Sequence, residues 1–202
     1  SGEDLDLQTL KVVDQVSGRQ LGVRADMTSQ AVRIDAHSAV TDSVQRLCYA
    51  GPVVFANPVS SQTSRVQLKA GVEIFGAPGI AADAEVVSLM LESLAVAKIN
   101  NPVLLLGHMG VYRSLVADLL ASGSLHSQQQ GQLFSAVQRK ASSDIRDLVG
   151  DGGVADMLVA LPNLMGPPDI LQQARTVLAD GPSGILQALD ELAQLAELVA
   201  LQ

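Results

Sequence analysis

The chain has 202 residues and a formal net charge of −8, and it is 48% apolar, 17% charged and 2% aromatic, without tryptophan. This balance is typical of a folded globular protein and excludes a disordered chain. The acidic charge argues against a general nucleic-acid surface, because phosphate binding needs clustered lysine and arginine. With so few aromatic residues, Leu, Val and Ala must fill the core, which favours packed helices.

Signals for disulfides, metals and membranes are nearly absent. Cys48 is the single cysteine, which excludes a disulfide framework and a thiolate metal site and predicts a small buried residue within a strand. A lone cysteine favours a reducing compartment, so we expect a cytoplasmic protein. No apolar run has the length of a membrane span and no signal peptide is recognised. The chain begins with Ser1, so we expect either a processed start or a part of a longer protein.

The first part of the chain carries the patterns of an antiparallel sheet with helices. In chain order we predict a loop, two short strands around a turn, a helix capped by Thr28, two longer strands and a helix, at residues 1–6, 9–14, 20–24, 28–40, 44–55, 65–75 and 82–99. Pro52 lies inside the first long strand, which predicts a missing ladder bond or a bulge.

The second part is predicted to be almost entirely helical. A fully apolar strand with both faces covered is expected at 103–107, and helices are expected at 110–122, 127–149, 152–160, 168–178 and 183–201. In the last helix an apolar stripe indicates either a packed face or a partner-helix surface, at Ile185, Leu189, Leu192, Ala196 and Val199. This α+β order predicts a sheet domain at 1–107 and a helical domain at 108–202.

Chemistry-bearing residues gather on the predicted sheet. Alternation along 65–75 places Lys69 and Glu73 on one face, and Asp26 and Thr28 stand where a strand gives way to a helix. Two carboxylates and a hydroxyl facing one cavity suit the ammonium of an amino acid. A surface polar network has the same spacing, so both interpretations stay open.

Motifs of catalysis and metal binding are not found. The sequence lacks a glycine-rich phosphate loop, a paired-cysteine zinc pattern and a nucleophile elbow. His37, His108 and His126 are scattered without ligand spacing. His108 ends a predicted buried strand, where it serves a structural hydrogen bond or lines a cavity. We therefore predict no catalytic residue, no metal and no cofactor.

Several blocks resemble histidyl-tRNA synthetases in their order and gaps, namely LGVRADMT at 21–28, RLCYAGP at 46–52, GVEIFG at 71–76 and DAE at 83–85. The resemblance implies a class II aminoacyl-tRNA synthetase-like antiparallel sheet with flanking helices, followed by a helical insertion. It also implies loss of aminoacylation, because Phe55 stands where the synthetases carry the arginine that holds the ATP α-phosphate. An apolar ring does not stabilise the charge that develops there.

Further blocks resemble the regulatory subunits of ATP phosphoribosyltransferase, namely RIDAH at 33–37, GHMGVYR at 107–113 and LPNLMG at 161–166. That resemblance implies a non-catalytic subunit of histidine biosynthesis that binds and activates the short catalytic subunit in a hetero-oligomer and lets histidine inhibit it. By the resemblance to the synthetases, Asp26, Thr28 and Glu73 match synthetase positions that contact histidine. Lys69 stands where glutamine is expected, and it either repels the ligand ammonium or pairs with the ligand carboxylate.

Two alternatives to this regulatory subunit are considered. In the first alternative the chain is a fragment of an active histidyl-tRNA synthetase, and Phe55 argues against this. In the second alternative it is an interaction fragment without a ligand. The family's earlier and later motifs are not found, so we expect an internal fragment. Half a sheet leaves an apolar patch, which predicts self-association as a dimer. Neither a nucleic-acid nor a membrane partner is expected.

Overall fold

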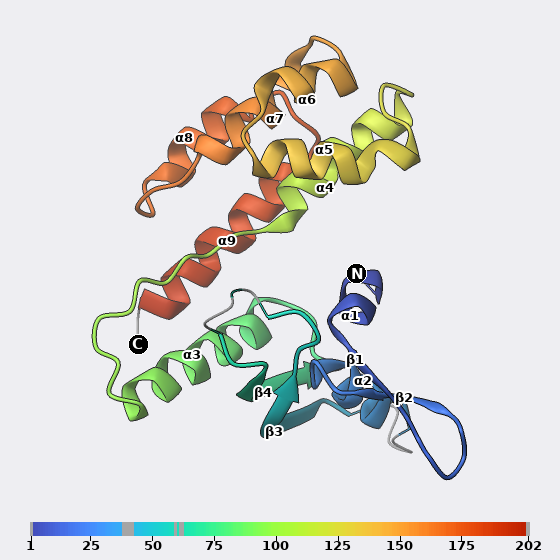
Figure 1. The fold of residues 1–202 in the computed structure, drawn as a ribbon. Coiled ribbons are helices and arrows are strands. Elements are labelled where there is room, and N and C mark those ends of the chain that lie inside the picture. Colours follow the sequence, from blue (N-terminus) through green and yellow to red (C-terminus); the bar gives the residue numbers. More distant parts are fainter. Residues whose placement is uncertain (1, 38–42, 59, 61–62, 201–202) are drawn as a thin grey trace. The chain divides into compact units, whose positions relative to one another are not determined.

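The computed structural model describes residues 2–37, 43–58, 60 and 63–200 (Figure 1). These form two compact units, Ser1–Ala82 and Asp83–Gln202. The first unit contains α1 (Gly2–Gln8), β1 (Leu10–Val13), β2 (Gln20–Val23), α2 (Thr28–His37), β3 (Gln45–Val54) and β4 (Val66–Phe75). The division into domains at 1–107 and 108–202 stays a prediction.

A tight hairpin joins β1 to β2, as the sequence predicts. The strands pair antiparallel from Leu10 opposite Val23 to Val13 opposite Gln20. Asp14 holds the turn, because its carboxylate accepts hydrogen bonds from the amides of Val16 and Ser17, both at 3.1 Å, and from the Ser17 hydroxyl. Gly18 completes the turn at a φ of +67°, a left-handed conformation that favours glycine.

The loop predicted at 1–6 is wrong, because Gly2–Gln8 is helical. The end of this short helix is satisfied by groups outside it. Asn57 donates its side-chain amide to the Leu7 carbonyl at 3.3 Å, and Ala56 donates its backbone amide to Gln8 at 2.8 Å. Such distant donors are invisible in the local sequence, and they complete carbonyls that a helix end leaves open.

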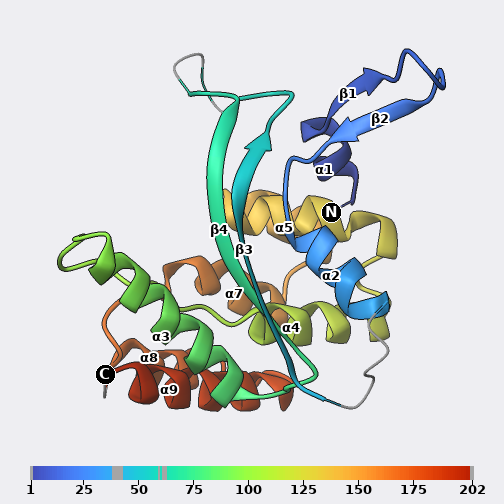
Figure 2. The ribbon, with the colours of Figure 1, turned by 90° about the horizontal axis from the view of Figure 1, so that it is seen from below.

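Pro52 does not interrupt β3, so the predicted missing ladder bond or bulge is wrong. The register runs unbroken from Gln45 opposite Phe75 to Val54 opposite Val66. Figure 2 shows β3 and β4 side by side along their length. The Pro52 carbonyl points away from β4, since it accepts from Arg24 Nε at 2.9 Å. In an antiparallel strand the nitrogen of a residue faces the same side as its carbonyl. The absent proline donor therefore costs β3–β4 no hydrogen bond.

The two faces of the β3–β4 pair differ in cover. The inner face carries Tyr49, Gly51, Val53, Lys69, Gly71 and Glu73, and all of these are buried or half-buried. The outer face carries Cys48, Ala50, Pro52, Val66, Leu68 and Ala70, and all of these are exposed. Leu68 keeps 86% of its surface in solvent, whereas Val53 keeps none. The prediction that Cys48 is buried is therefore wrong, because it lies on the outer face.

Helix α2 begins at Thr28, but the predicted cap lies one residue earlier. The carbonyl of Met27 accepts the amide of Ala31 at 3.0 Å, which makes Met27 the residue before the first turn. Thr28 is thus the first helical residue, and its hydroxyl has another partner, described below. The predicted continuation to residue 40 lies outside the described residues beyond His37.

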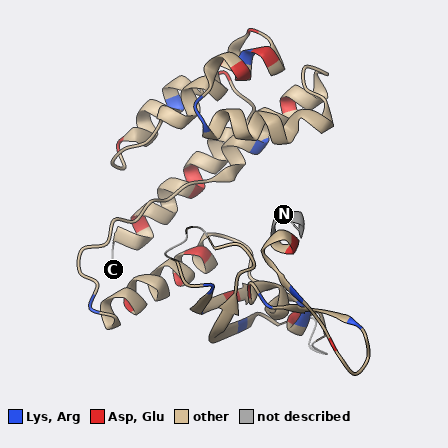
Figure 3. Ribbon diagram, in the orientation of Figure 1, with Lys and Arg blue, Asp and Glu red and all other residues tan. Residues whose placement is uncertain are grey.

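The second unit is helical, as predicted. α3 (Ile80–Val96) begins at the end of the first unit and runs into the second. The elements that follow are α4 (Met109–Ala121), η1 (Ser127–Gln129), α5 (Gln130–Gln138), α6 (Ser142–Val149), α7 (Gly153–Ala160), η2 (Leu161–Asn163), α8 (Ile170–Val177) and α9 (Gly184–Ala200). Their core is aliphatic, and Leu115, Leu158 and Ile185 are fully buried in it. Acidic residues outnumber basic ones in this unit (Figure 3).

The single helix predicted at 127–149 is wrong, because a short 3-10 turn precedes two helices that are separated at Lys140. Lys140 has a φ of +56°. Its amide donates to Val137 at 3.0 Å, and the next amide, of Ala141, donates to Ala136 at 2.9 Å. This pair of bonds is a Schellman motif, which normally uses glycine at the left-handed position. A lysine in that place gives no warning in the sequence.

The strand predicted at 103–107 is also wrong. The segment is extended but belongs to no strand within the described residues. Val103 is 86% exposed and Leu105 is 77% exposed, so the expected cover on both faces is absent there. The predicted stripe of α9 packs in its first part, where Ile185 and Leu189 are buried and α9 lies along α4. Its later members are half-buried, namely Leu192, Ala196 and Val199.

Candidate functional site

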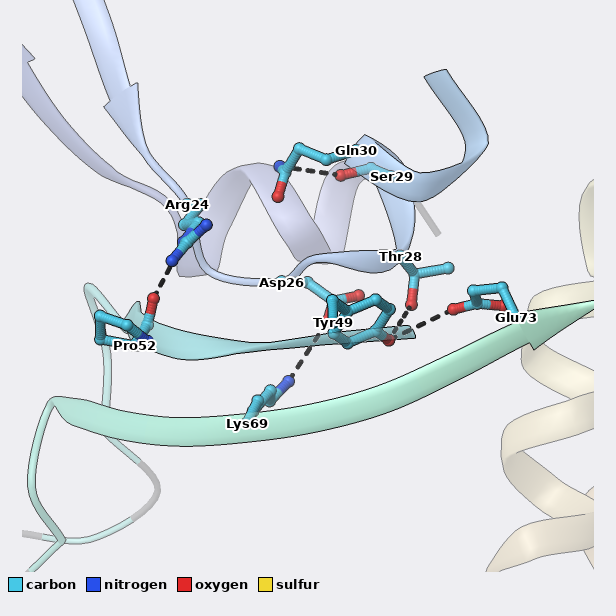
Figure 4. A network of polar contacts seen from close by, with 9 residues as sticks. All are labelled: Arg24, Asp26, Thr28, Ser29, Gln30, Tyr49, Pro52, Lys69 and Glu73. Atoms are coloured by element: carbon cyan, nitrogen blue, oxygen red, sulfur yellow. Dashed lines mark hydrogen bonds and ion pairs between the residues drawn. The ribbon is translucent and has the colours of Figure 1, made fainter. Parts of the chain in front are cut away.

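The candidate site lies where residues 24–28 cross the inner face of β3 and β4 (Figure 4). Backbone and side-chain bonds hold this crossing segment to the free edge of β3. Val54 donates its amide to the Arg24 carbonyl at 3.0 Å, and the Arg24 side chain donates from Nε to the Pro52 carbonyl. Ala25 and Met27, which belong to this segment, are buried. The alternate residues Asp26 and Thr28 are half-buried and keep their polar atoms at the sheet.

Tyr49 joins residues from two different segments. Its hydroxyl lies 3.2 Å from Thr28 Oγ1 and 3.2 Å from Glu73 Oε1. Thr28 approaches this hydroxyl from the crossing segment and Glu73 approaches it from β4, while Tyr49 itself lies on β3 (Figure 4). The hydroxyl of Thr28 is therefore used at the sheet, which is why it does not serve the predicted role at the helix end.

Gly71 makes room for the tyrosine ring. It is the cross-strand partner of Tyr49. A Cβ at Gly71 would lie 2.5 Å from both Cζ and the hydroxyl oxygen of Tyr49. That is far inside van der Waals contact, so a side chain at residue 71 displaces the ring.

Lys69 and Asp26 form a second polar contact. Lys69 Nζ lies 3.4 Å from Asp26 Oδ1, and about a third of each side chain is exposed. The same ammonium lies 5.3 Å from the centre of the Phe55 ring, within range of a cation–π contact. An exposed ion pair of this length is weak, so a ligand can take either partner at little cost.

Together these contacts supply acceptors and one cation. Glu73, Asp26 and Thr28 offer oxygen atoms that suit an ammonium or an imidazole N–H, while Lys69 suits a carboxylate. Within residues 2–37, 43–58, 60 and 63–200, no group of three His, Cys, Asp or Glu is placed to hold a metal ion. Acceptors and a cation of this kind could together contact the charged groups of a small zwitterion.

The structure brings the four predicted residues into two neighbouring contacts, Asp26 with Lys69 and Thr28 with Glu73 through Tyr49. Sequence reasoning missed Tyr49 as a member of the site. The usable signal was its place directly opposite Gly71, which requires the strand register. Whether these residues bind histidine stays a proposal.

His108 is structural, as one of the two interpretations predicts. Its Nδ1 accepts the amide of Gly110 at 3.0 Å, which caps the start of α4. Because Nδ1 accepts, the ring proton is on Nε2, which lies 2.9 Å from Glu191 Oε2 on α9. His37 lies on the surface of α2, with Nδ1 2.8 Å from the Arg33 carbonyl.

Two clefts lie in the second unit, apart from the candidate residues. One has a volume of about 530 Å³ between α5 and α6, and Ser135, Arg139 and Asp144 are among its lining residues. The other has a volume of about 590 Å³ at the end of α3, beside Glu92 and Asn101. Both are open to solvent, and neither is lined by Asp26, Thr28, Lys69 or Glu73.

The fold and the crossing segment define a class II synthetase-like protein, and comparison with known proteins agrees. A family model described as Histidyl-tRNA synthetase matches residues 1–202. A crystal structure titled as an ATP phosphoribosyltransferase regulatory subunit/histidyl-tRNA synthetase from Bacillus halodurans aligns with a TM-score of 0.80 and 25% identity. The alignment covers 98% of this chain and 50% of that one. The chain therefore belongs to the histidyl-tRNA synthetase family.

Within that family, similar curated proteins are named ATP phosphoribosyltransferase regulatory subunit, which confirms the resemblance found in the sequence. The protein of that name from Stutzerimonas stutzeri is 42% identical over 204 residues, covering 100% of this chain and 51% of the relative. The one from Chromohalobacter salexigens is 44% identical over 203 residues, covering 98% and 51%. The chain thus spans about half the length of these relatives. Among the described residues, no helix is long and apolar enough to cross a membrane.

Proposed function

We propose that this chain is part of a non-catalytic regulatory subunit that binds the short catalytic subunit of ATP phosphoribosyltransferase, activates it and conveys inhibition by histidine. The names of the relatives support the partner, and the site supports the effector. The observation that carries the effector is the convergence of Thr28, Tyr49 and Glu73 on the inner face. The proposed location of the protein is the cytoplasm.

Histidine occupies the inner face beneath the crossing segment. Its ammonium lies among the oxygens of Asp26, Thr28 and Glu73, and its carboxylate pairs with Lys69. The weak ion pair between Lys69 and Asp26 supports this arrangement, because opening it releases a cation for the carboxylate and an acceptor for the ammonium.

Aminoacylation is lost in this account. Phe55 stands at the position where the resemblance places the arginine for the ATP α-phosphate, and its ring faces the Lys69 ammonium. The acidic excess of the helical unit is also a poor surface for tRNA. An ATP–pyrophosphate exchange assay with histidine is expected to give no signal above a no-enzyme control. Exchange at the rate of a synthetase would support the alternative of an active enzyme.

A second copy of the chain packs on the outer face of β3 and β4. An exposed apolar surface lies there, made of Leu68, Val66, Cys48 and Ala50. Burying this surface against another apolar surface is favourable because of the hydrophobic effect. Self-association as a dimer is thus part of the proposal. The second copy packs on the outer face and does not contact the inner-face residues that are proposed to bind the effector.

Calorimetric titration tests the effector. The full-length protein is titrated with histidine alone and again with the short catalytic subunit present. Binding to the protein alone supports the inner-face site. Binding only to the complex moves the site to the partner interface, and no binding in either case, with no change in the partner's rate, contradicts the regulatory function.

A further inference from the structure

One hydroxyl connects the acceptor groups of the candidate site. Tyr49 lies on β3 between Thr28, on the crossing segment, and Glu73, on β4, at 3.2 Å from each (Figure 4). The geometry alone leaves the donor of the Thr28 contact open, since either hydroxyl has a proton to give.

The chemistry of the three groups fixes the direction of both bonds. An ionised carboxylate only accepts, so Tyr49 donates its one proton to Glu73. With that proton committed, Tyr49 can only accept from Thr28. The Thr28 hydroxyl must then donate toward Tyr49, and the remaining free groups on Thr28 Oγ1 are lone pairs. The chain of bonds runs from Thr28 to Tyr49 to Glu73.

We propose that Tyr49 is a positioning residue that makes Thr28 an acceptor and thereby selects a ligand that presents an N–H donor to it, which for an amino acid bound as proposed is the primary ammonium. Thr28 then offers lone pairs and no competing proton, while Glu73 is held by one oxygen and keeps the other for the ligand. This inference rests on the proposed function, because it assumes that an amino acid binds at the inner face.

Gly71 sets the position of the tyrosine hydroxyl. The ring can lie across the strand only because residue 71 has no Cβ, which would stand 2.5 Å from the hydroxyl oxygen. Gly71→Ala therefore displaces the hydroxyl from Thr28 and Glu73 together. It is expected to reproduce the binding defect of a variant that lacks the hydroxyl.

The test compares two ligands on the full-length protein, histidine and 3-(imidazol-4-yl)propionate, which lacks the ammonium. Tyr49→Phe is expected to weaken histidine about tenfold, the loss of one or two hydrogen bonds to a charged group. Binding of the propionate is expected to change less than twofold. The matched control is Tyr112→Phe, which removes the hydroxyl of the chain's other tyrosine, in the helical unit.

Equal binding of histidine by Tyr49→Phe and the unchanged protein would overturn the inference while leaving the proposed function standing. An equal loss of both ligands would also overturn it, since that marks a purely structural role. If Tyr49→Phe fails to fold, Thr28→Val tests the same acceptor, and it must weaken histidine binding while leaving binding of the propionate within twofold. Thr28→Ser, which keeps the hydroxyl, is the control and is expected to bind histidine like the unchanged protein. Failure of the unchanged protein and its complex to bind histidine removes the proposed function, and this inference with it.

Discussion

Lys69 and Asp26 meet across the candidate site, with Nζ 3.4 Å from Oδ1. They are 43 residues apart in the chain, and the crossing segment brings them together. The pair neutralises a carboxylate that a ligand ammonium would use, so the occupied site must rearrange it. In the proposed complex, Lys69 leaves Asp26 and pairs with the ligand carboxylate.

Lys69→Gln is therefore expected to weaken histidine binding about tenfold, because a neutral amide replaces a charged donor to the carboxylate. Histidinol, which lacks the carboxylate, is expected to bind the variant as well as it binds the unchanged protein. The measurement is calorimetric titration with both ligands. Lys11→Gln is the control, since that lysine pairs with Asp6 at 2.9 Å on β1 outside the site. Tighter histidine binding by Lys69→Gln would show that the lysine competes for Asp26 instead.

Leu68→Lys is expected to reduce self-association, because it places a charge in the centre of the exposed outer face. Histidine binding is expected to stay within twofold, since the outer face points away from the inner one. Sedimentation velocity over a range of concentrations measures the dimer. Val103→Lys is the matched control, because Val103 is equally exposed, at 86%, but lies in the other unit. An unchanged dimer in Leu68→Lys would contradict the outer-face interface.

Tyr112→Phe is expected to stabilise the protein by about 1 kcal/mol, because the Tyr112 hydroxyl is buried and has no hydrogen-bond partner among the residues that the structure describes. The ring contact with Phe134, at 5.4 Å between centres, is kept by phenylalanine. The measurement is urea unfolding at neutral pH. A destabilised variant would mean that the hydroxyl makes a bond of real value.

The same residue gives a dependence on pH. Burial raises the pKa of Tyr112 above its ordinary value of 10.0, so the folded state holds this proton more tightly than the unfolded state. Stability from this group is complete below pH 10 and falls as the pH rises through the folded pKa. The difference in unfolding free energy between the unchanged protein and Tyr112→Phe is expected to widen above pH 10. A constant difference would contradict this.

Asp14 is expected to titrate below its ordinary value in an NMR experiment. The Ser17 hydroxyl, followed by the amides of Val16 and Ser17, lowers the pKa of Asp14 from 3.8. Its contribution to the hairpin is present above pH 3.8 and is lost as the pH falls through the lowered pKa. Ser17→Ala is expected to move the midpoint back upward, and an unmoved midpoint would mean that the backbone amides alone hold the carboxylate.

Sequence patterns predicted the four strands of the first unit and which residues of the last one share a face, but not which face is covered. Alternation along 65–75 placed Lys69 with Glu73 and Leu68 with Val66, and the structure keeps both groupings. Apolar alternation usually marks the buried face. Here the polar face is covered, because the crossing segment packs on it, and that packing is set by residues forty positions away.

Element ends were predicted poorly where their signals lie outside the local sequence. A left-handed lysine, Lys140, divides a helix that glycine would have marked. Donors from residues 56 and 57 complete the end of α1. In the site, Asp26 and Glu73 were found from residue type and resemblance, whereas Tyr49 became apparent only from its register opposite Gly71.

The most direct test of the account is histidine titration of the full-length protein beside its Glu73→Gln variant. Glutamine keeps the size of the side chain and removes the charge that the account assigns to the ammonium. Histidine is expected to bind the unchanged protein and to bind the variant at least tenfold more weakly, with the fold intact by circular dichroism. Equal affinity in both proteins would contradict it, because histidine would then bind away from the inner face of β3 and β4.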